Sequence, residues 1–295
     1  MGSRIGVRNL SKRTFWRSVG RFFSGTATHF RLGFRNKREI KYYYNFALGV
    51  VYNEFLKSAH QRPNKQAYRI GQEFHKYVLS IDPFLDDPSF SPRVKKRITL
   101  PEIKGIPTSS KNISNFVLRV KQSNLSREQK REIMRAVNSF RQTAAKGVNM
   151  TFADPFADFS VVLKGIELTG GKMYGTWAEI VALAHGIGVV DAKRMHKSFS
   201  SLSTSMQFVD DALDCLKDFG VQQNLFISLS KRDSIEFSRL KQEAKKRQKI
   251  SFSWLKKRFP NTFKIYEREF RRTILKIPED EETLRRFTYD SFFGW

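Results

Sequence analysis

The sequence predicts an all-α fold, and three observations support that prediction. Apolar residues recur at helical spacing along most of the chain, whereas the strict alternation typical of strands is rare. Hydrophobic residues make up 40% of the 295 residues and include 27 phenylalanines, enough to bury a substantial core. Glycine, proline and capping residues divide the apolar stretches into helix-sized pieces. We therefore expect one helical domain, at residues 39–275.

The first half of this domain contains three predicted helices and a proline-rich segment. The helices are expected at 39–60, 64–81 and 126–146. A capping box formed by Ser126 and Gln129 opens the third helix, and Gly147 is expected to end it. Prolines recur from Pro83 to Pro107, so we expect residues 82–107 to form mainly loops and turns.

The second half begins with a short helix at 154–165 and an apolar segment at 173–190. Asp191 is the expected N-cap of a long helix that runs to Phe219 and stops at Gly220. Shorter helices are expected after it, at 224–229, 233–248, 252–259 and 262–275.

Both ends of the chain and its net charge limit the classes of partner. Lys and Arg total 54 against 28 acids, a formal charge of +26, which favours a polyanionic partner: nucleic acid, an anionic membrane surface or a phosphate-bearing substrate. Residues 1–38 carry ten basic residues and no acid, so they read as a presequence, a membrane-associating segment or a solvated tail. Residues 276–295 are expected to be a C-terminal tail. The single Cys215 excludes an intramolecular disulfide, and no apolar run approaches the about 18 residues of a membrane span.

An aspartate cluster on the predicted long helix is the most informative feature. Asp210, Asp214 and Asp218 recur every four residues, so they fall within one narrow arc together with Gln207. Like charges at this spacing repel by roughly 0.2–0.5 kcal/mol per pair. A bound cation would reverse that cost, and magnesium is commonly shared between carboxylates and substrate phosphates. The alternative is a solvated acidic face.

The residues of this cluster resemble a known motif. Residues 207–214, continued by Asp218, resemble the second aspartate-rich motif of trans-prenyl diphosphate synthases, and the spacing is also similar to a metal-binding motif of terpene cyclases. Both groups are class I isoprenoid synthases. The resemblance implies their fold, a single bundle of about ten helices around a central apolar cavity.

Two further segments extend the resemblance. Lys172, in residues 169–177, resembles a lysine of prenyl synthases that reaches the substrate diphosphate. Asp82, Asp86 and Asp87 have a spacing similar to the first motif of squalene and phytoene synthases, although Pro83 interrupts the match and an Asx-Pro turn is the alternative reading.

The resemblance implies a role for each residue of these segments. The implied metal ligands are Asp82, Asp86, Asp87, Asp210, Asp214 and Asp218. The implied catalytic residues are Asp210, Asp211, Asp214 and Lys172. The implied substrate-binding residues are Lys172, Gln207, Lys217, Tyr174 and Trp177. The cofactor would be Mg²⁺, with three ions when substrate is bound.

The implied activity is ionisation of an allylic prenyl diphosphate followed by chain elongation, with cyclisation or head-to-head condensation as the alternative. We expect a prenyl diphosphate substrate, an anionic membrane surface as a further partner, and a cytoplasmic protein, peripheral at the membrane; an organellar location follows if residues 1–38 are a presequence. The sequence is also compatible with a homodimer. A basic helical protein that binds nucleic acid, and a catalytically inactive relative, are the competing hypotheses.

Overall fold

The computed structural model describes residues 37–86, 107–151, 154–246 and 250–293. Every regular element in these ranges is helical, which confirms the all-α prediction. The first group of helices is α2 (Lys37–Ser58), α3 (Lys65–Asp86), α5 (Pro107–Lys121), α6 (Arg127–Thr151) and α7 (Phe159–Leu168). The second group is α8 (Gly170–Ala184), α9 (Val189–Asp218), α10 (Leu225–Ser230), α11 (Ser234–Ala244), α12 (Phe252–Arg258), α13 (Pro260–Ile274), the short 3₁₀ helix η1 (Glu279–Glu281) and α14 (Glu282–Phe293).

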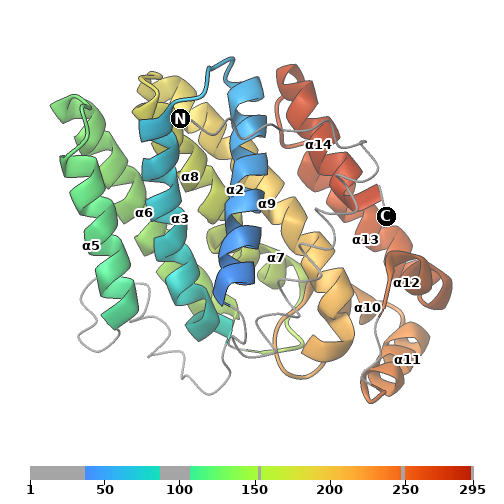
Figure 1. The fold of residues 1–295 in the computed structure, drawn as a ribbon. Helices are drawn as coiled ribbons and strands as arrows, with labels where there is room; N and C mark the ends of the chain where they lie inside the picture. The colour runs from blue at the N-terminus through green and yellow to red at the C-terminus, as the bar shows by residue number, and fades with distance from the viewer. Residues whose placement is uncertain (1–36, 87–106, 152–153, 247–249, 294–295) are drawn as a thin grey trace.

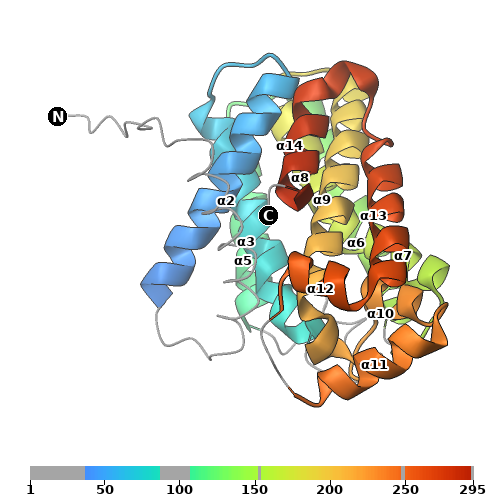
Figure 2. The same cartoon turned by 90° about the vertical axis from the view of Figure 1, so that its right-hand side faces the viewer.

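Helix α8 lies in the middle of the bundle and packs against α9, α3, α6 and α7 (Figure 1). Helices α3 and α9 run in the same direction and opposite to α8 (Figures 1 and 2). The C-terminal ends of α3 and α9 therefore lie at the same end of the bundle as the start of α8. We call this the mouth end.

Two apolar cores lie along α9. The N-terminal core joins α2, α3, α5, α6 and α8 to the first half of α9, around large buried side chains such as Phe55, Phe74, Trp177 and Phe199. The C-terminal core joins α7 and helices α10 to α13 to the second half of α9, around Phe208, Phe226, Phe259 and Tyr266. The same long helix thus supplies one wall of each core.

Several predicted helix boundaries are confirmed by their hydrogen bonds. The Ser126 amide donates to Gln129 Oε1 at 2.8 Å and the Gln129 amide donates to Ser126 Oγ at 3.1 Å, as a capping box requires. Asn224 and Asp233 cap α10 and α11 by accepting from backbone amides of the first turn. Gly220, at φ +75°, follows the end of α9 in the left-handed conformation expected of a helix stop.

Several predicted boundaries are wrong: the helix expected at 154–165 is α7, Phe159–Leu168, and the one expected at 233–248 is α11, Ser234–Ala244. Three further differences have a clear physical reason. Helix α6 continues through Gly147 to Thr151; a Cβ at Gly147 would lie 2.9 Å from Leu168 Cβ, so this glycine serves a close helix contact and not a stop. Helix α3 continues through Pro83 to Asp86, because a proline removes one hydrogen bond without excluding a last helical turn. Helix α9 begins at Val189 with Gly188 as N-cap, and Asp191 lies inside its first turn, where an acid favours the macrodipole.

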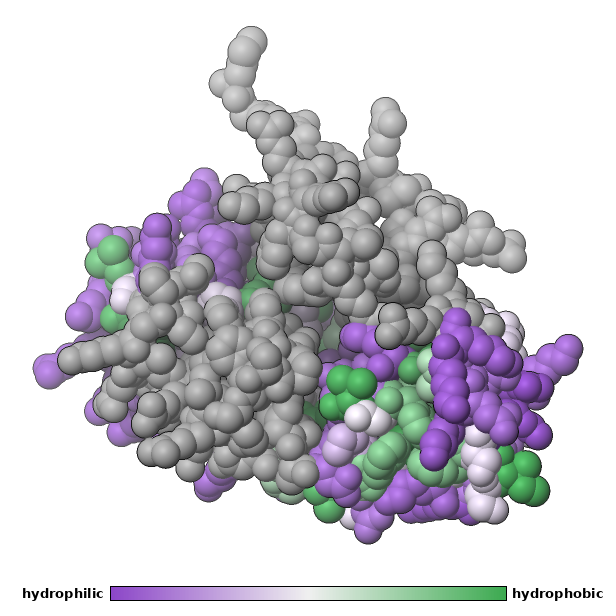
Figure 3. All heavy atoms as spheres, turned by 90° about the horizontal axis from the view of Figure 1, so that it is seen from below, coloured by the Kyte–Doolittle hydropathy of each residue, from purple (hydrophilic) through white to green (hydrophobic). Residues whose placement is uncertain are grey.

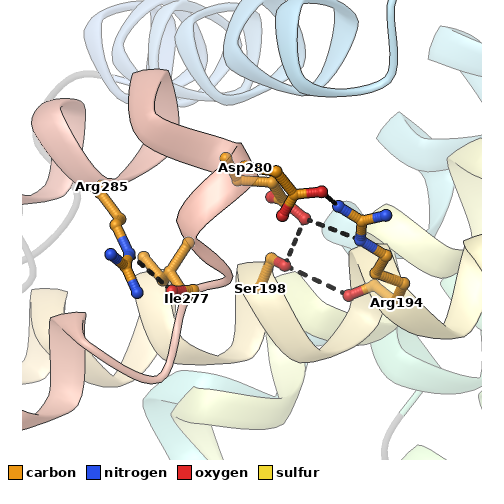
Figure 4. Close-up of polar contacts among 6 residues, drawn as sticks. Arg194, Ser198, Ile277, Asp280 and Arg285 are labelled. Carbon is orange, nitrogen blue, oxygen red and sulfur yellow. Dashed lines mark hydrogen bonds and ion pairs between the residues drawn. The ribbon is translucent and has the colours of Figure 1, made fainter.

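Residues 276–293 are part of the bundle, although we expected a tail there. Ile277, Leu284 and Phe287 are buried in the N-terminal core. Figure 4 shows how α9 holds this segment: Arg194 forms ion pairs with Asp280 and Glu281, and Ser198 Oγ donates to Glu281 Oε1 at 2.7 Å. The segment thus joins the bundle through apolar burial and a buried polar contact.

The turn that precedes α14 is held by the side chain of Arg285. Arg285 Nε donates to the Ile277 carbonyl at 2.6 Å (Figure 4). Among the helices of the described residues, none combines the length and apolar character needed to cross a membrane.

Candidate active site

The aspartates of α9 occupy its last three turns, at the mouth end. Gln207 lies against the start of α8, since a Cβ at Gly170 would be 3.4 Å from Gln207 Cδ. Asp210 and Asp214 continue the same side of α9 past the point where α8 begins, because they fall within about 60° of Gln207 on a helix. Both are partly exposed. Their carboxylates therefore lie beyond the N-terminal end of α8, where α8 no longer covers this side of α9.

Asp211 faces the C-terminal core. Its Oδ2 accepts a hydrogen bond of 2.6 Å from the Leu225 amide at the start of α10, and the residue is buried. Burial raises the pKa of the Asp211 carboxyl well above its usual range, and the Leu225 amide opposes that rise. This contact joins α9 to α10, and the catalytic role that we expected for Asp211 stays a prediction.

Asp218 is the most buried acid of the stripe, at 2% exposure. Its Oδ2 accepts from Asn224 Nδ2 at 3.0 Å, while its Oδ1 has no hydrogen-bond partner and lies 3.8 Å from Lys217 Nζ. Burial raises the pKa of Asp218 to about 6, and Lys217 opposes that rise. An unpartnered buried carboxylate oxygen is costly, so a cation at this position would be stabilising.

Lys217 also lies beside Asp214, with Nζ 3.4 Å from Asp214 Oδ2. Its side chain is 44% exposed, so the ion pair contributes little to stability. The ammonium is consequently available near the carboxylates for a phosphate oxygen.

The carboxylates of α9 could supply some of the ligands of a magnesium ion, but not a complete set. Carboxylate oxygens are the ligands that Mg²⁺ prefers, and Asp214 with the unpartnered Asp218 Oδ1 provides such donors next to Asp210. Within the described residues, no group of three or more His, Cys, Asp or Glu side chains is arranged to hold a metal ion. Further ligands would have to come from another helix, from water or from the substrate.

The first predicted acidic motif lies at the same end of the bundle. Residues 82 and 86 belong to the final turns of α3, which ends at the mouth end together with α9 (Figure 1). The side chains of Asp82 and Asp86, and all of Asp87, lie outside the described residues. Figure 3 shows this end of the molecule, where hydrophilic and hydrophobic side chains are interspersed over the described part.

The two aromatic residues predicted to bind substrate are both buried between α8 and its neighbours. Trp177 is fully buried in the N-terminal core, with its ring 6.1 Å from that of Phe55. The position opposite on α3 is Gly71, where a Cβ would lie 2.7 Å from Trp177 Nε1. Trp177 is therefore a packing residue in this structure.

Tyr174 lies one turn closer to the mouth end and stacks on His75 of α3, with ring centroids 5.9 Å apart. Burial lowers the pKa of His75 to about 4, so its imidazole is neutral at pH 7. We did not single out His75 from the sequence, because a lone histidine on an apolar helix gives no distinguishing signal.

Lys172 does not contact the aspartates of α9. Its Nζ lies 3.2 Å from His196 Nε2, and His196 Nδ1 lies 2.7 Å from Glu179 Oε2. Burial lowers the pKa of the Lys172 ammonium, and Glu179 opposes that effect. Sequence reasoning did not identify Glu179 and His196; the only available signal was the seven-residue spacing of Lys172 and Glu179, which places both on one helix face.

Two solved structures resemble this arrangement over nearly the whole chain. One is a geranylgeranyl pyrophosphate synthetase from the archaeon Geoglobus acetivorans, with a TM-score of 0.57 and 14% identity over 93% of this chain and 98% of that one. This chain has the fold of the class I isoprenoid synthases. A second geranylgeranyl pyrophosphate synthase gives a TM-score of 0.54 and 12% identity over 96% of this chain and 98% of that one. No family model and no curated protein sequence matches the chain.

Proposed function

We propose that this isoprenoid synthase-fold protein is a Mg²⁺-dependent prenyl transferase, which ionises an allylic diphosphate and joins its prenyl group to a second isoprenoid unit. The main support is the placement of the α9 aspartates and the end of α3 at one end of a bundle that is similar in fold to geranylgeranyl pyrophosphate synthases. The match with the Geoglobus acetivorans structure covers almost all of both chains, so the likeness extends to the whole bundle.

Metal would be held chiefly by Asp210 and Asp214 from α9, with Asp82 and Asp86 from α3 as the predicted opposing ligands. When bound, Mg²⁺ supplies positive charge that offsets the negative charge developing on the departing diphosphate. Asp218, whose pKa is about 6 and whose Oδ2 is held by Asn224, would complete the site through its unpartnered oxygen.

The chain's own cations would assist the departure of the diphosphate. Lys217 Nζ lies between Asp214 and Asp218 and can donate to a phosphate oxygen without leaving the mouth end. Lys172 is the second predicted cation. Tyr174 and His75 form a neutral, buried ring pair on the inner side of α8, an environment that would exclude water from a carbocation.

The test is release of pyrophosphate from geranyl, farnesyl and geranylgeranyl diphosphates, with and without isopentenyl diphosphate, in Mg²⁺ and in EDTA. We expect Asp210→Asn to lower turnover by at least about 100-fold, as for loss of a group that stabilises developing charge. Asp191→Asn is the matched control, because Asp191 is an exposed acid at the opposite end of the same helix.

The outcomes separate the reactions. Turnover that requires isopentenyl diphosphate supports elongation, whereas turnover without it supports cyclisation or condensation of two identical substrates. The proposal fails if the folded protein releases no pyrophosphate under any of these conditions. A catalytically inactive protein would then be the better description.

An anionic membrane surface is one of the polyanionic partners that fit the charge of +26, and we propose it as a partner beside the substrate. Sedimentation with phosphatidylserine vesicles at physiological salt tests this, and the same assay with phosphatidylcholine vesicles controls for apolar adsorption. Light scattering decides whether the protein forms a homodimer.

A further inference from the structure

Lys172, His196 and Glu179 form a chain of three polar side chains between α8 and α9. The His196 and Glu179 side chains are 18% and 13% exposed. A neutral imidazole carries one N–H; when Nδ1 donates it to the Glu179 carboxylate, Nε2 is left as an acceptor for the Lys172 ammonium. The ammonium therefore has a defined partner in the absence of substrate.

Gly175 makes room for this arrangement. It lies on α8 between Lys172 and Glu179, and a Cβ there would be 2.6 Å from the His196 carbonyl oxygen and would also overlap Ser200 Oγ. Any larger residue would push α9 away from α8. The close approach of the two helices thus allows the His196 ring to reach both partners.

The contact directs Lys172 away from the aspartates. His196 precedes Asp210 by 14 residues on α9, which is about 21 Å along the helix axis. Helical side chains ordinarily lean toward the N-terminus of their helix, and the N-terminus of α8 lies at the mouth end. Lys172 instead extends toward the C-terminal part of α8, where Glu179 lies.

The backbone of Lys172 is nevertheless close to the mouth end. The preceding Gly171 packs against Thr204, since a Cβ there would be 2.5 Å from Thr204 Oγ1. Thr204 precedes Asp210 by six residues, about 9 Å along the axis. An extended lysine side chain together with a bound diphosphate can bridge that separation.

We infer that His196 and Glu179 are positioning residues that hold the Lys172 ammonium at rest, and that the ammonium leaves them to contact a diphosphate bound beside Asp210 and Asp214. The inference rests on the proposed function, because it needs a diphosphate at the mouth end. Other charges near Lys172 are Lys164 and Glu167 of α7, of which Glu167 is paired with Lys276. The contact with His196 and Glu179 weakens diphosphate binding, because only Lys172 side chains released from that contact can reach the diphosphate.

The experiment measures binding of inorganic pyrophosphate with Mg²⁺ to the full chain by calorimetry. We expect His196→Ala and Glu179→Gln to bind about 2- to 10-fold more tightly than the unmodified protein, because a larger fraction of Lys172 is free. Lys172→Ala should bind about 10-fold more weakly. In the double variant His196→Ala/Lys172→Ala the gain should disappear, which shows that it acts through the lysine.

His185→Ala is the matched control. His185 is also half-buried, and its Nε2 contacts Tyr52 Oη at 3.0 Å near the other end of α8. Its removal should leave the affinity for pyrophosphate unchanged. If His196 has a purely structural role, His196→Ala should weaken the affinity for pyrophosphate or leave it unchanged. Folded His196→Ala protein that binds pyrophosphate no more tightly than the unmodified protein therefore overturns the inference.

A second measurement keeps this result separate from the proposed function. Acetic anhydride modifies free lysine amines, and mass spectrometry reports the rate at Lys172 in each variant. Faster modification in His196→Ala and Glu179→Gln supports the hold, and an unchanged rate contradicts it. If the unmodified protein and all its variants bind no pyrophosphate, the proposed function fails, while the labelling still decides whether the ammonium is held.

Discussion

The two cores of the bundle share α9 but are held together differently. In the N-terminal core, long helices approach closely at glycines: a Cβ at Gly71 would overlap Trp177, and one at Gly171 would overlap Thr204. In the C-terminal core, the helices have 6 to 15 residues and depend on polar side chains that bind helix ends. The N-terminal core is thus stabilised mainly by shape complementarity, the C-terminal core also by individual hydrogen bonds.

The reason is that every helix leaves about four backbone N–H groups without a partner, whatever its length. Short helices therefore have more such groups per residue. Glu236 illustrates the solution: its two carboxylate oxygens accept from the amides of Asn261 and Thr262 at 3.0 and 2.8 Å, at the start of α13. The second half of α9 is held by contacts of this kind on the side facing α10, which leaves Asp210 and Asp214 on another side.

The largest effect should come from shape in the N-terminal core. Trp177→Ala removes a fully buried indole from between α8, α2 and α9 and should lower the free energy of unfolding by about 3–5 kcal/mol. Urea unfolding followed by circular dichroism measures this change. A loss below about 1 kcal/mol would mean that this core can collapse around the cavity.

In the C-terminal core, Asn224 should have the next largest effect. Its Oδ1 accepts from two amides of α10, while its Nδ2 donates to the Asp211 carbonyl and to Asp218. Asn224→Ala should cost about 2–3 kcal/mol, from the lost cap and from buried groups left without partners. The exposed Asn115→Ala on α5 should change the same unfolding measurement by less than about 0.5 kcal/mol.

The N-terminal core should also respond to acid through His75. Burial holds its pKa at about 4 in the folded protein, against 6.5 for a solvated histidine, so the unfolded chain takes up the proton first as pH falls. Its contribution to stability is complete above pH 6.5 and is lost between pH 6.5 and 4. From pH 7.5 to 5 the loss should be about 2 kcal/mol. Urea unfolding of His75→Phe at both pH values should show a smaller difference if His75 is the source.

The smallest effect should come from an exposed cap. Ser251 Oγ accepts from the Trp254 amide at 3.2 Å at the start of α12. Ser251→Ala should lower the free energy of unfolding by about 0.5–1 kcal/mol, and Ser251→Asp should restore it because aspartate caps equally well. Equal losses in both variants would show that the cap is not the stabilising contact.

Helix ends were predictable from sequence where the ending residue acts on its own backbone, and not where it acts on a distant helix. Gly220 ends α9 as expected, and the helix expected at 224–229 begins where Asn224 caps α10, because both effects are local. Gly147 has the same sequence signature as a stop, but its role is to let α6 approach Leu168 and Thr169. Nothing within a few residues of Gly147 carries that information.

The sequence alone determined that the chain is all-α, that its long helix carries an acidic stripe, and that the stripe resembles the metal-binding motif of isoprenoid synthases, because periodicity and spacing are local properties. The tertiary structure decided where each aspartate of α9 points. Asp211 faces the C-terminal core and accepts from the Leu225 amide, while Asp210 and Asp214 lie past the start of α8. It also decided that Lys172 meets His196 and Glu179. Such contacts depend on which helices become neighbours, and burial of the two cores along α9 sets that choice.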